Sequence, residues 1–289
     1  MHPRADLELT FADGGVMSLG LRTRVMGVLN VTPDSFSDGN RYPDLPSALE
    51  TARQMVDGGA DIIDVGGEST RPGADPVEET EEINRVIPVI EGIKKALTVR
   101  VSVDTRKAGV ARRAIDAGAD MINDVSTLHD GAMLPLLHET GTPVVLMHMR
   151  GEPRTMQRAT RYDDIVAEVV GFLQDCADTA ASAGLADDKI LIDPGIGFGK
   201  SAAGSMTLLN ELPSLAQIGR PILIGASRKS FIGTVLDLPV EDRLEGSLAI
   251  AAFAAAQGAH MVRAHDVRAT LRAVRMIDAI RSTQRPDRP

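Results

Sequence analysis

The stretch Gly59–Val65, with the sequence GADIIDV, indicates the fold of this chain because it recurs. Gly118–Val125, GADMINDV, repeats its glycine, its Ala-Asp pair and its apolar residues, and Gly258–Arg263, GAHMVR, is a third copy. In each copy a glycine that can end a helix is followed by a short run rich in Val, Ile and Met. The repeated unit therefore predicts a helix end, a tight turn and a β-strand.

Eight apolar runs of this kind occur, and they do not alternate cleanly, which is typical of parallel strands covered on both faces. The predicted strands are Val25–Val31, Asp61–Val65, Val99–Val103, Asp120–Val125, Pro143–Met147, Lys189–Ile192, Pro221–Ile224 and Ala259–Arg263. Segments with helical spacing lie between them, at Ser47–Asp57, Glu79–Ala96, Ala108–Ala117, Ile165–Ala183, Leu244–Gln257 and Val267–Arg281. Alternating strands and helices occur in closed barrels and in doubly wound sheets, and eight units in one uninterrupted chain favour a (β/α)₈ TIM barrel.

Residues 1–289 are predicted to form a single domain, with a barrel core from about residue 24 to about residue 280. Leu7–Leu19, with Asp13-Gly14-Gly15 at its centre, has the pattern of an N-terminal β-hairpin that could plug the bottom of the barrel. No segment has the composition of a linker that would divide the chain.

The composition is that of an acidic globular protein, with 31 Lys and Arg against 40 Asp and Glu and a net charge of −9. Sequence-independent nucleic-acid binding needs a basic surface, so we expect no nucleic-acid partner. No apolar run approaches the ~18 residues of a membrane span, and we expect neither a signal peptide nor a membrane partner. The single cysteine, Cys176, excludes an intrachain disulfide and is compatible with the cytoplasm.

Polar residues follow every predicted strand, at the end of a barrel where functional sites lie. Such residues also cap helices and stabilise turns, and that structural role is the alternative explanation at each single position. The same pattern at eight strand ends favours a binding site over eight separate caps.

Three of these residues, Asp104, Asn123 and Asp193, follow different strands and are expected to converge at the mouth of the barrel. A carboxylate can accept two N–H groups from the edge of an aminopyrimidinone ring. Lys229, after another strand, could meet a ring nitrogen or a carbonyl oxygen. This set therefore favours a flat heterocycle as the ligand.

An anion site is predicted next to it. Arg263 and His265 are two residues apart on one strand, so their side chains point the same way, and a phosphate suits the pair. Asn30 and the carboxylates of the loop after the first strand offer hard oxygen ligands for Mg²⁺, which commonly binds few protein groups beside substrate phosphates.

Several other motifs are incomplete. Gly195–Ser201 resembles a phosphate-binding loop but has Pro194 where that loop needs its first glycine, and Gly67–Arg71 lacks the final glycine of a hydrolase elbow. No Cys–His cluster suggests zinc, and His148 by itself is expected to be a core or rim histidine.

The complete motifs resemble those of one family, the dihydropteroate synthases. Met26–Gly39 resembles the first signature of that family and Gly67–Gly73 the second. The other matching motifs, in the same order, are Asp193–Lys200, Ser227–Ser230 and Arg263–Val267. The likeness extends from about Arg24 to Ala279, with no departure at a motif position.

The resemblance implies a homodimeric transferase of folate biosynthesis, from a family that sulfonamides target. It implies that 6-hydroxymethyl-7,8-dihydropterin pyrophosphate reacts with p-aminobenzoate, in the presence of Mg²⁺, to give 7,8-dihydropteroate and pyrophosphate. The reaction is a substitution at the pterin methylene, in which the leaving group departs largely before the amine attacks, and it needs no protein nucleophile.

The resemblance also implies roles for single residues. The residues implied to bind the pterin pyrophosphate are Thr70, Asp104, Asn123, Met147, Asp193, Lys229, Arg263 and His265. Those implied to line the p-aminobenzoate site are Phe36, Thr70, Arg71, Pro72, Lys229 and Ser230. Asn30 and Asp38 are the implied Mg²⁺ ligands, and Asp104, Lys229 and Asp38 are the catalytic candidates.

Two alternatives share the barrel and the pterin pocket. A pterin-dependent methyltransferase domain would pass a methyl group to a corrinoid protein, and the p-aminobenzoate loops and Ser227-Arg228-Lys229 argue against it. A non-catalytic pterin-binding paralogue would bind the ligand without turnover, and the intact motifs argue against that.

Overall fold

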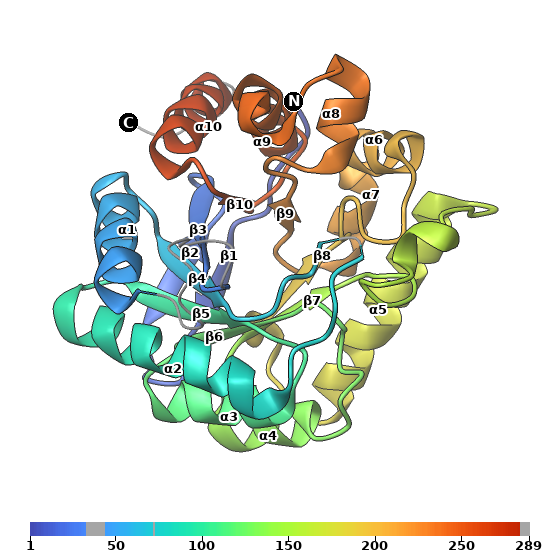
Figure 1. Cartoon of the computed structure of the whole chain (residues 1–289). Coiled ribbons are helices and arrows are strands. Elements are labelled where there is room, and N and C mark those ends of the chain that lie inside the picture. Colours follow the sequence, from blue (N-terminus) through green and yellow to red (C-terminus); the bar gives the residue numbers. More distant parts are fainter. Residues whose placement is uncertain (33–43, 72, 284–289) are drawn as a thin grey trace.

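Eight parallel strands form a barrel at the centre of the structure, a computed structural model that describes residues 1–32, 44–71 and 73–283. The strands are β3 (Arg24–Asn30), β4 (Ile62–Gly66), β5 (Arg100–Asp104), β6 (Met121–Asp124), β7 (Val144–Met147), β8 (Ile190–Asp193), β9 (Leu223–Gly225) and β10 (Met261–Ala264). They pair in the order β8-β7-β6-β5-β4-β3-β10-β9, and a bridge between Ile192 and Ile222 joins the two ends. Helices surround the strands (Figure 1), which confirms the predicted TIM barrel.

Ten α-helices occur in the described part of the chain. They are α1 (Leu45–Asp57), α2 (Glu79–Ala96), α3 (Ala108–Asp116), α4 (Met133–Thr140), α5 (Ile165–Ser182), α6 (Ala202–Asn210), α7 (Leu212–Leu215), α8 (Ser230–Leu236), α9 (Leu244–Ala256) and α10 (Val267–Ser282). Short 3₁₀ turns lie at Met156–Arg158, Asp187–Lys189, Ala216–Ile218 and Val240–Asp242. All eight predicted strands and all six predicted helices are confirmed, with ends that differ by a few residues at most.

Four helices, α4, α6, α7 and α8, were not predicted from the sequence. They are short, α4 contains Pro135, and α6 contains Gly204 and Ser205, so their intrinsic helical signal is weak. They form because a few residues, such as Leu137 and Leu208, are buried against the barrel.

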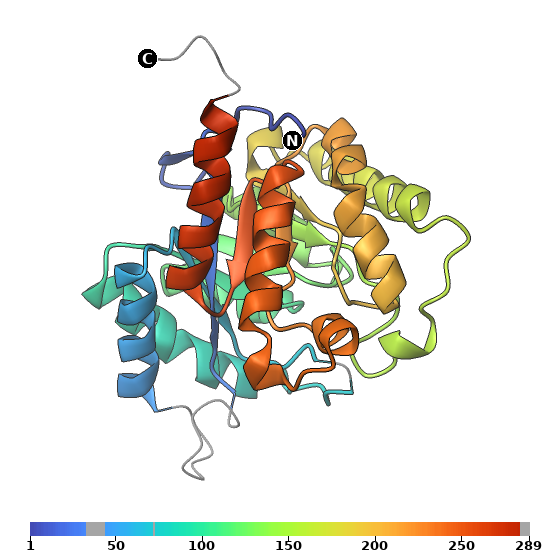
Figure 2. The same ribbon diagram turned by 90° about the horizontal axis from the view of Figure 1, so that it is seen from above.

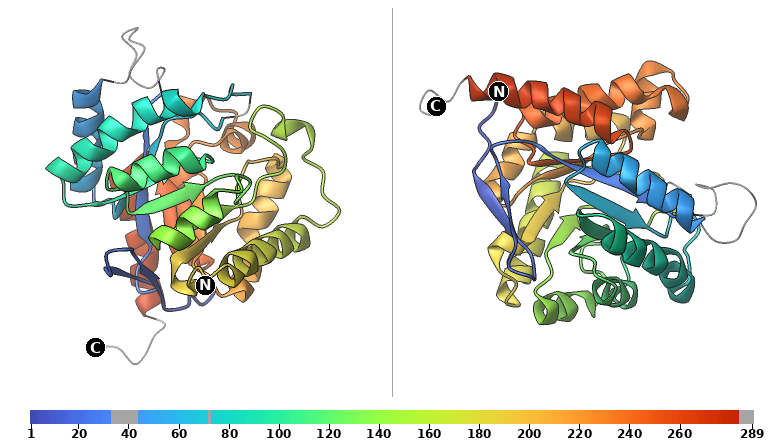
Figure 3. Two further views of the ribbon diagram at one scale, coloured as in Figure 1. Left: turned by 90° about the horizontal axis from the view of Figure 1, so that it is seen from below. Right: turned by 90° about the vertical axis from the view of Figure 1, so that its left-hand side faces the viewer.

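The N-terminal hairpin closes one end of the barrel, as predicted. Its strands β1 (Leu7–Thr10) and β2 (Val16–Leu19) pair antiparallel. Leu9, Phe11 and Leu19 are buried against apolar side chains from the first residues of the barrel strands, among them Met26 and Ile62. Figure 3 shows the hairpin, in dark blue, at this end of the barrel. Because the hairpin fills the barrel from below, a ligand can reach the interior only from the opposite end, where the strands terminate.

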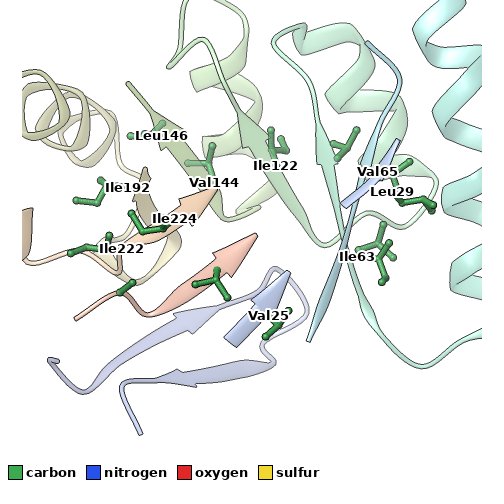
Figure 4. Packing of buried hydrophobic residues seen from close by; sticks show 14 of the residues in the cluster. Val25, Leu29, Ile63, Val65, Ile122, Val144, Leu146, Ile192, Ile222 and Ile224 are labelled. Carbon is green, nitrogen blue, oxygen red and sulfur yellow. The ribbon is translucent and has the colours of Figure 1, made fainter. Parts of the chain in front are cut away.

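A second apolar layer lies between the strands and the helices. Neighbouring residues of one strand face opposite ways: Met26 and Ile62 face the hairpin cluster, whereas Val25 and Ile63 pack in the layer under the helices (Figure 4). Burying each such side chain contributes roughly 1.5–3 kcal/mol. This packing on both faces explains why the strands lack a clean alternation of polar and apolar residues.

Candidate active site

The strand register places the predicted polar residues at one level of the barrel. Asn30 pairs with Gly66, Gly66 with Asp104, and Asp104 with Asn123, so these four positions form a continuous row across β3 to β6. Asp193 pairs with Met147 in the same way. Residues that are far apart in the sequence therefore converge at the open end of the barrel, as predicted.

Arg263 lies between two carboxylates inside this end of the barrel. Its Nε donates to Asp64 Oδ2 at 2.6 Å, and its Nη2 donates to Asp104 Oδ2 at 2.6 Å. Asn123 Nδ2 also donates to Asp64 Oδ2, at 3.0 Å. Burial raises the pKa of Asp104 to about 7, and the neighbouring Asp64 adds to the rise while Arg263 opposes it. Arg263 thus meets carboxylates here, beside the position where the sequence predicted a phosphate.

Asp193 and Lys229 occupy the other side of the site. Asp193 is 5% exposed, and its Oδ1 accepts a hydrogen bond from Gly195 N at 2.7 Å. Burial raises the pKa of Asp193 to about 6. Lys229 Nζ lies 3.6 Å from the centre of the Phe198 ring, and burial, followed by the charge of Arg263, lowers the pKa of Lys229 to about 7.

The backbone before Lys229 is held in an uncommon conformation. Arg228 has a φ of 57°, in the left-handed region that costs a non-glycine residue free energy. Asp266 accepts two hydrogen bonds from the Arg228 guanidinium, at 2.9 and 2.8 Å, and Ser247 Oγ accepts one from Arg228 N at 2.9 Å. These contacts stabilise the turn that carries Lys229 into the barrel.

His265 follows β10, above Arg263, and is half-buried. Its Nδ1 lies 3.1 Å from Ser227 Oγ, which also accepts a hydrogen bond from His265 N. Burial and the charge of Arg263 lower the pKa of His265 to about 4, so the imidazole is neutral at neutral pH. It can therefore offer an anion one N–H donor but no charge.

The second loop, residues 67–77, is anchored at both ends. Arg85 donates to Gly67 O at 2.9 Å, and Lys107 Nζ donates to Val77 O at 2.6 Å and to Glu68 Oε2 at 2.5 Å. Lys107 also bonds the buried Glu82, whose pKa is raised by burial. Between these anchors Thr70 is half-buried and Arg71 is exposed. Arg71 is therefore accessible to a ligand above the barrel.

Three of the remaining predicted residues are described by the structure, and three are not. Met147 is 3% exposed and packs with Val125, Met156 and Phe198 in an apolar cluster at the mouth. Asn30 is half-buried, and Ser230 is exposed at the start of α8. Phe36, Asp38 and Pro72 lie outside the described residues.

Sequence reasoning missed Asp64, and it gave no individual role to Ser227 or Lys200, which it placed within motifs. Asp64 has the clearest signal, since it is a carboxylate inside an apolar strand with the same inward parity as Ile62. Lys200 is buried and donates to the carbonyls of Gly195 and Phe198, which shapes the loop after Asp193. The roles of Asp64 and Lys200 could not be assigned without knowing which side chains face the interior.

Two residues set aside in the sequence have the ordinary roles expected of them. His148 is buried, with Nδ1 2.8 Å from Lys200 Nζ and its ring edge-on to Phe172. Burial raises the pKa of the Cys176 thiol to about 11, so it is a poor nucleophile.

Among the described residues no cluster of three or more His, Cys, Asp or Glu side chains could hold a metal ion. No helix of the described chain is long and apolar enough to cross a membrane.

Residues 26–265 match the model of a protein family described as pterin binding enzyme. A dihydropteroate synthase of Escherichia coli (strain K12) is 47% identical over 274 residues, which cover 95% of this chain and 97% of the relative. One from Synechocystis is 47% identical over 263 residues, 90% of this chain and 91% of the relative.

Solved structures agree with the sequence matches. A Yersinia pestis dihydropteroate synthase in complex with a sulfonamide drug has a TM-score of 0.89 and 45% identity, covering 96% of this chain and 100% of its own. A Xanthomonas albilineans dihydropteroate synthase with 4-aminobenzoic acid has a TM-score of 0.89 and 44% identity, covering 96% and 99%. The barrel and the hairpin therefore have solved counterparts over nearly their whole length.

Proposed function

The chain belongs to the pterin-binding family of dihydropteroate synthases, and from that membership we propose how its residues carry out the reaction. The reaction joins 6-hydroxymethyl-7,8-dihydropterin pyrophosphate to p-aminobenzoate, and it belongs to folate biosynthesis. The observation that carries the assignment of roles is the convergence of Asp104, Asn123, Asp193, Lys229 and Arg263 at one end of the barrel. The methyltransferase and non-catalytic alternatives have no support, because relatives named as synthases match over nearly their full length.

The pterin ring is assigned to the buried polar residues. Asp193 accepts two N–H groups from the aminopyrimidinone edge, Asp104 and Asn123 bond the opposite side of the ring system, and Lys229 meets a ring nitrogen or the carbonyl. Met147 supplies an apolar surface for the ring face. The support for this assignment is that Asp104, Asn123 and Asp193 are buried, Lys229 is half-buried, and each follows a different strand.

The pyrophosphate is assigned to the outer part of the site. Arg263 and His265 bind its oxygens, and Thr70 lies between the two substrates. Arg263 bonds Asp104 in the structure, so both residues must change partners when the substrate binds. Asp104 then bonds the pterin, and Arg263 turns its Nη2 toward the phosphate. Asp64 retains the other edge of the guanidinium during this exchange.

Asn30 is the described residue that would hold Mg²⁺, with Asp38 beyond the described residues. A Cβ placed on Gly66 would lie 3.7 Å from Asn30 Oδ1 and 3.8 Å from Asp104 Oδ2, so both oxygens lie beside this position at the mouth of the barrel. Hard oxygen donors of this kind fit Mg²⁺. The ion, when bound, would stabilise the charge that develops on the departing pyrophosphate.

The p-aminobenzoate is assigned to the mouth of the barrel. Arg71, exposed on the second loop, would bind its carboxylate, and Ser230, exposed at the start of α8, would line the same site beside Lys229. Phe36 and Pro72, which complete the assignment, lie outside the described residues.

The proposed reaction forms no covalent bond to the protein. The C–O bond to pyrophosphate breaks, the C–N bond to the amine forms, and the amine nitrogen releases a proton. The protein contributes by binding the leaving group and excluding water from the reacting carbon. Asp104, Lys229 and Asp38 are the proposed catalytic residues, since they contact the substrate nearest the reacting arm.

Turnover is expected to depend on Mg²⁺. Dihydropteroate formation from the two substrates should be robust with Mg²⁺ and should be lost in excess chelator, because the leaving group then departs with uncompensated charge. Asn30→Ala should raise the Mg²⁺ concentration needed for half-maximal rate by about tenfold. Full activity in chelator would contradict the proposed metal site, and absence of product under any condition would contradict the function itself.

As the pH falls, pterin binding is expected to weaken at a pH well above the ordinary pKa of an aspartate. Only ionised Asp193 can accept two N–H groups, and its pKa of about 6 lies above the ordinary 3.8. The kcat/KM for pterin pyrophosphate should therefore fall as the pH drops through about 6, and fall again as Lys229 loses its proton above about 7. In Asp193→Asn the limb near pH 6 should disappear, and the acid limb that remains should be that of Asp104, whose pKa is about 7.

We also propose a homodimer and a cytoplasmic location. Large apolar side chains are exposed on neighbouring helices α9 and α10, which lie side by side in Figure 2: Phe253 on α9, and Met276 and Ile280, one turn apart, on α10. Large apolar side chains exposed on two packed helices are compatible with a subunit interface on this face. The cytoplasm is the ordinary location for a protein with one free cysteine.

A further inference from the structure

Asp64 is the most deeply buried charged residue of the site, and the proposed roles leave it without direct contact to substrate. It lies on β4 two residues before Gly66, one step deeper in the barrel than Asp104, and its side chain is 0% exposed. One oxygen, Oδ2, accepts hydrogen bonds from both Arg263 and Asn123. The other, Oδ1, is buried and accepts no hydrogen bond from any side chain or backbone group of the described residues.

The bond to Asn123 fixes which way that amide points. An ionised carboxylate can only accept hydrogen bonds, so Asn123 must turn its Nδ2 toward Asp64. Its carbonyl oxygen is then the atom left free to face the barrel mouth. A ligand N–H would therefore find an acceptor at this position.

The bond to Arg263 fixes the plane of the guanidinium in a comparable way. Nε is held by Asp64 at 2.6 Å, which leaves the Nη2 edge for Asp104 before binding and for the substrate afterwards. Without Asp64, Asp104 would be the one carboxylate of the described residues that still bonds Arg263, and a pterin that took Asp104 would leave the guanidinium with no such partner.

We propose that Asp64 is a positioning residue of the pterin pocket, which sets the donor–acceptor polarity of Asn123 and holds Arg263 while Asp104 changes partner. The proposal rests on the assignment of Asn123 and Arg263 to the pterin pyrophosphate. Asp64 does not touch the substrate: it acts through these two side chains, one in each half of the ligand site.

The chain contains a matched control on the same strand unit. Asp61, three residues earlier, is also a carboxylate that pairs with arginine: Arg22 lies at 2.5 Å and Arg24 at 2.9 Å. It also accepts a hydrogen bond from Val25 N at 2.9 Å. It lies at the opposite end of the strand, near the hairpin. Asp61→Asn therefore removes a comparable ion pair from the barrel without altering the mouth.

The test is the affinity of 6-hydroxymethyl-7,8-dihydropterin, measured by calorimetry, in Asp64→Asn and Asp61→Asn. The asparagine has the shape of Asp64 but can present its NH₂ group, so Asn123 loses its fixed polarity. We expect Asp64→Asn to bind the dihydropterin about 10- to 100-fold more weakly. In steady state, the KM for pterin pyrophosphate should rise while the KM for p-aminobenzoate stays unchanged. Asp61→Asn should match the wild type in all three.

A double-mutant cycle separates positioning from a general structural role. Asn123→Ala removes one of the two side chains on which Asp64 acts, so adding Asp64→Asn should weaken dihydropterin binding by clearly less than it does in the wild-type background. Effects that multiply instead, or a Asp64→Asn variant that binds like the wild type, would overturn the proposal. Asp64→Ser, which is smaller and carries a hydroxyl in place of the carboxylate, serves if the asparagine variant does not fold. Turnover by the wild type and by Asp61→Asn tests the proposed function separately.

Discussion

Replacing Asp193 by alanine is expected to abolish measurable pterin binding and turnover while the barrel stays folded. Asp193 is 5% exposed at the end of β8, where the site is dry enough to raise its pKa to about 6. A ligand that donates two N–H groups to this carboxylate would lose a charge-assisted pair, which costs about 1.5–3 kcal/mol for each hydrogen bond. Calorimetry with the dihydropterin should detect a loss of two or more orders of magnitude.

Two further variants make this result specific. Asp193 Oδ1 also accepts the hydrogen bond from Gly195 N, so alanine loosens the following loop as well as removing the charge. Asp193→Asn keeps one acceptor for Gly195 and isolates the contribution of the charge. Asp188→Ala removes an exposed carboxylate beside the start of the same strand, where Asp188 bonds only Thr10 among the described residues, and it should bind as the wild type does. Unchanged affinity in Asp193→Ala would exclude the pterin-binding role.

Replacing Lys229 by methionine is expected to lower kcat/KM for pterin pyrophosphate by about 10²- to 10³-fold, the usual effect of removing one preorganised donor from a low-dielectric site. Lys229 is the cation that we assign to the pterin ring, and it follows Arg228, whose backbone is left-handed. Lys189→Met is the control, because Lys189 is also half-buried but donates to Gly141 O away from the mouth. A kcat/KM within a few-fold of the wild type would show that Lys229 does not act on the substrate.

Thermal unfolding of Lys229→Met should separate lost function from lost fold. Burial lowers the pKa of Lys229 from 10.5 to about 7, so the folded protein holds this proton less readily than the unfolded chain does. Protonated Lys229 therefore costs folding free energy at and below neutral pH, and this cost disappears as the pH rises toward the unfolded value. Methionine removes the cost, and we expect the variant to melt no lower than the wild type at pH near 7. A marked drop in melting temperature would assign Lys229 a structural role instead.

The amino-acid sequence by itself determined the architecture, because parallel strands buried on both faces require long apolar runs wherever they occur. Eight such runs, separated by segments of helical period, leave few folds open, and the glycine that ends each repeated helix fixes where the next strand begins. The short helices α4, α6 and α8 escaped prediction because tertiary burial of a few leucines and a phenylalanine, rather than local propensity, makes them helical.

The sequence also determined which side chains reach the site, since strand ends in a closed barrel must meet: Asp104, Asn123 and Asp193 converge as predicted. Only the tertiary structure decided how these groups pair. Arg263 looked like a free anion receptor, yet it lies between Asp64 and Asp104, which are 199 and 159 residues away in the chain. Charges in a barrel interior compensate across strands, because a buried charge without a counter-charge is too costly. The spacing of residues along the chain does not indicate which distant carboxylate will neutralise a given buried arginine.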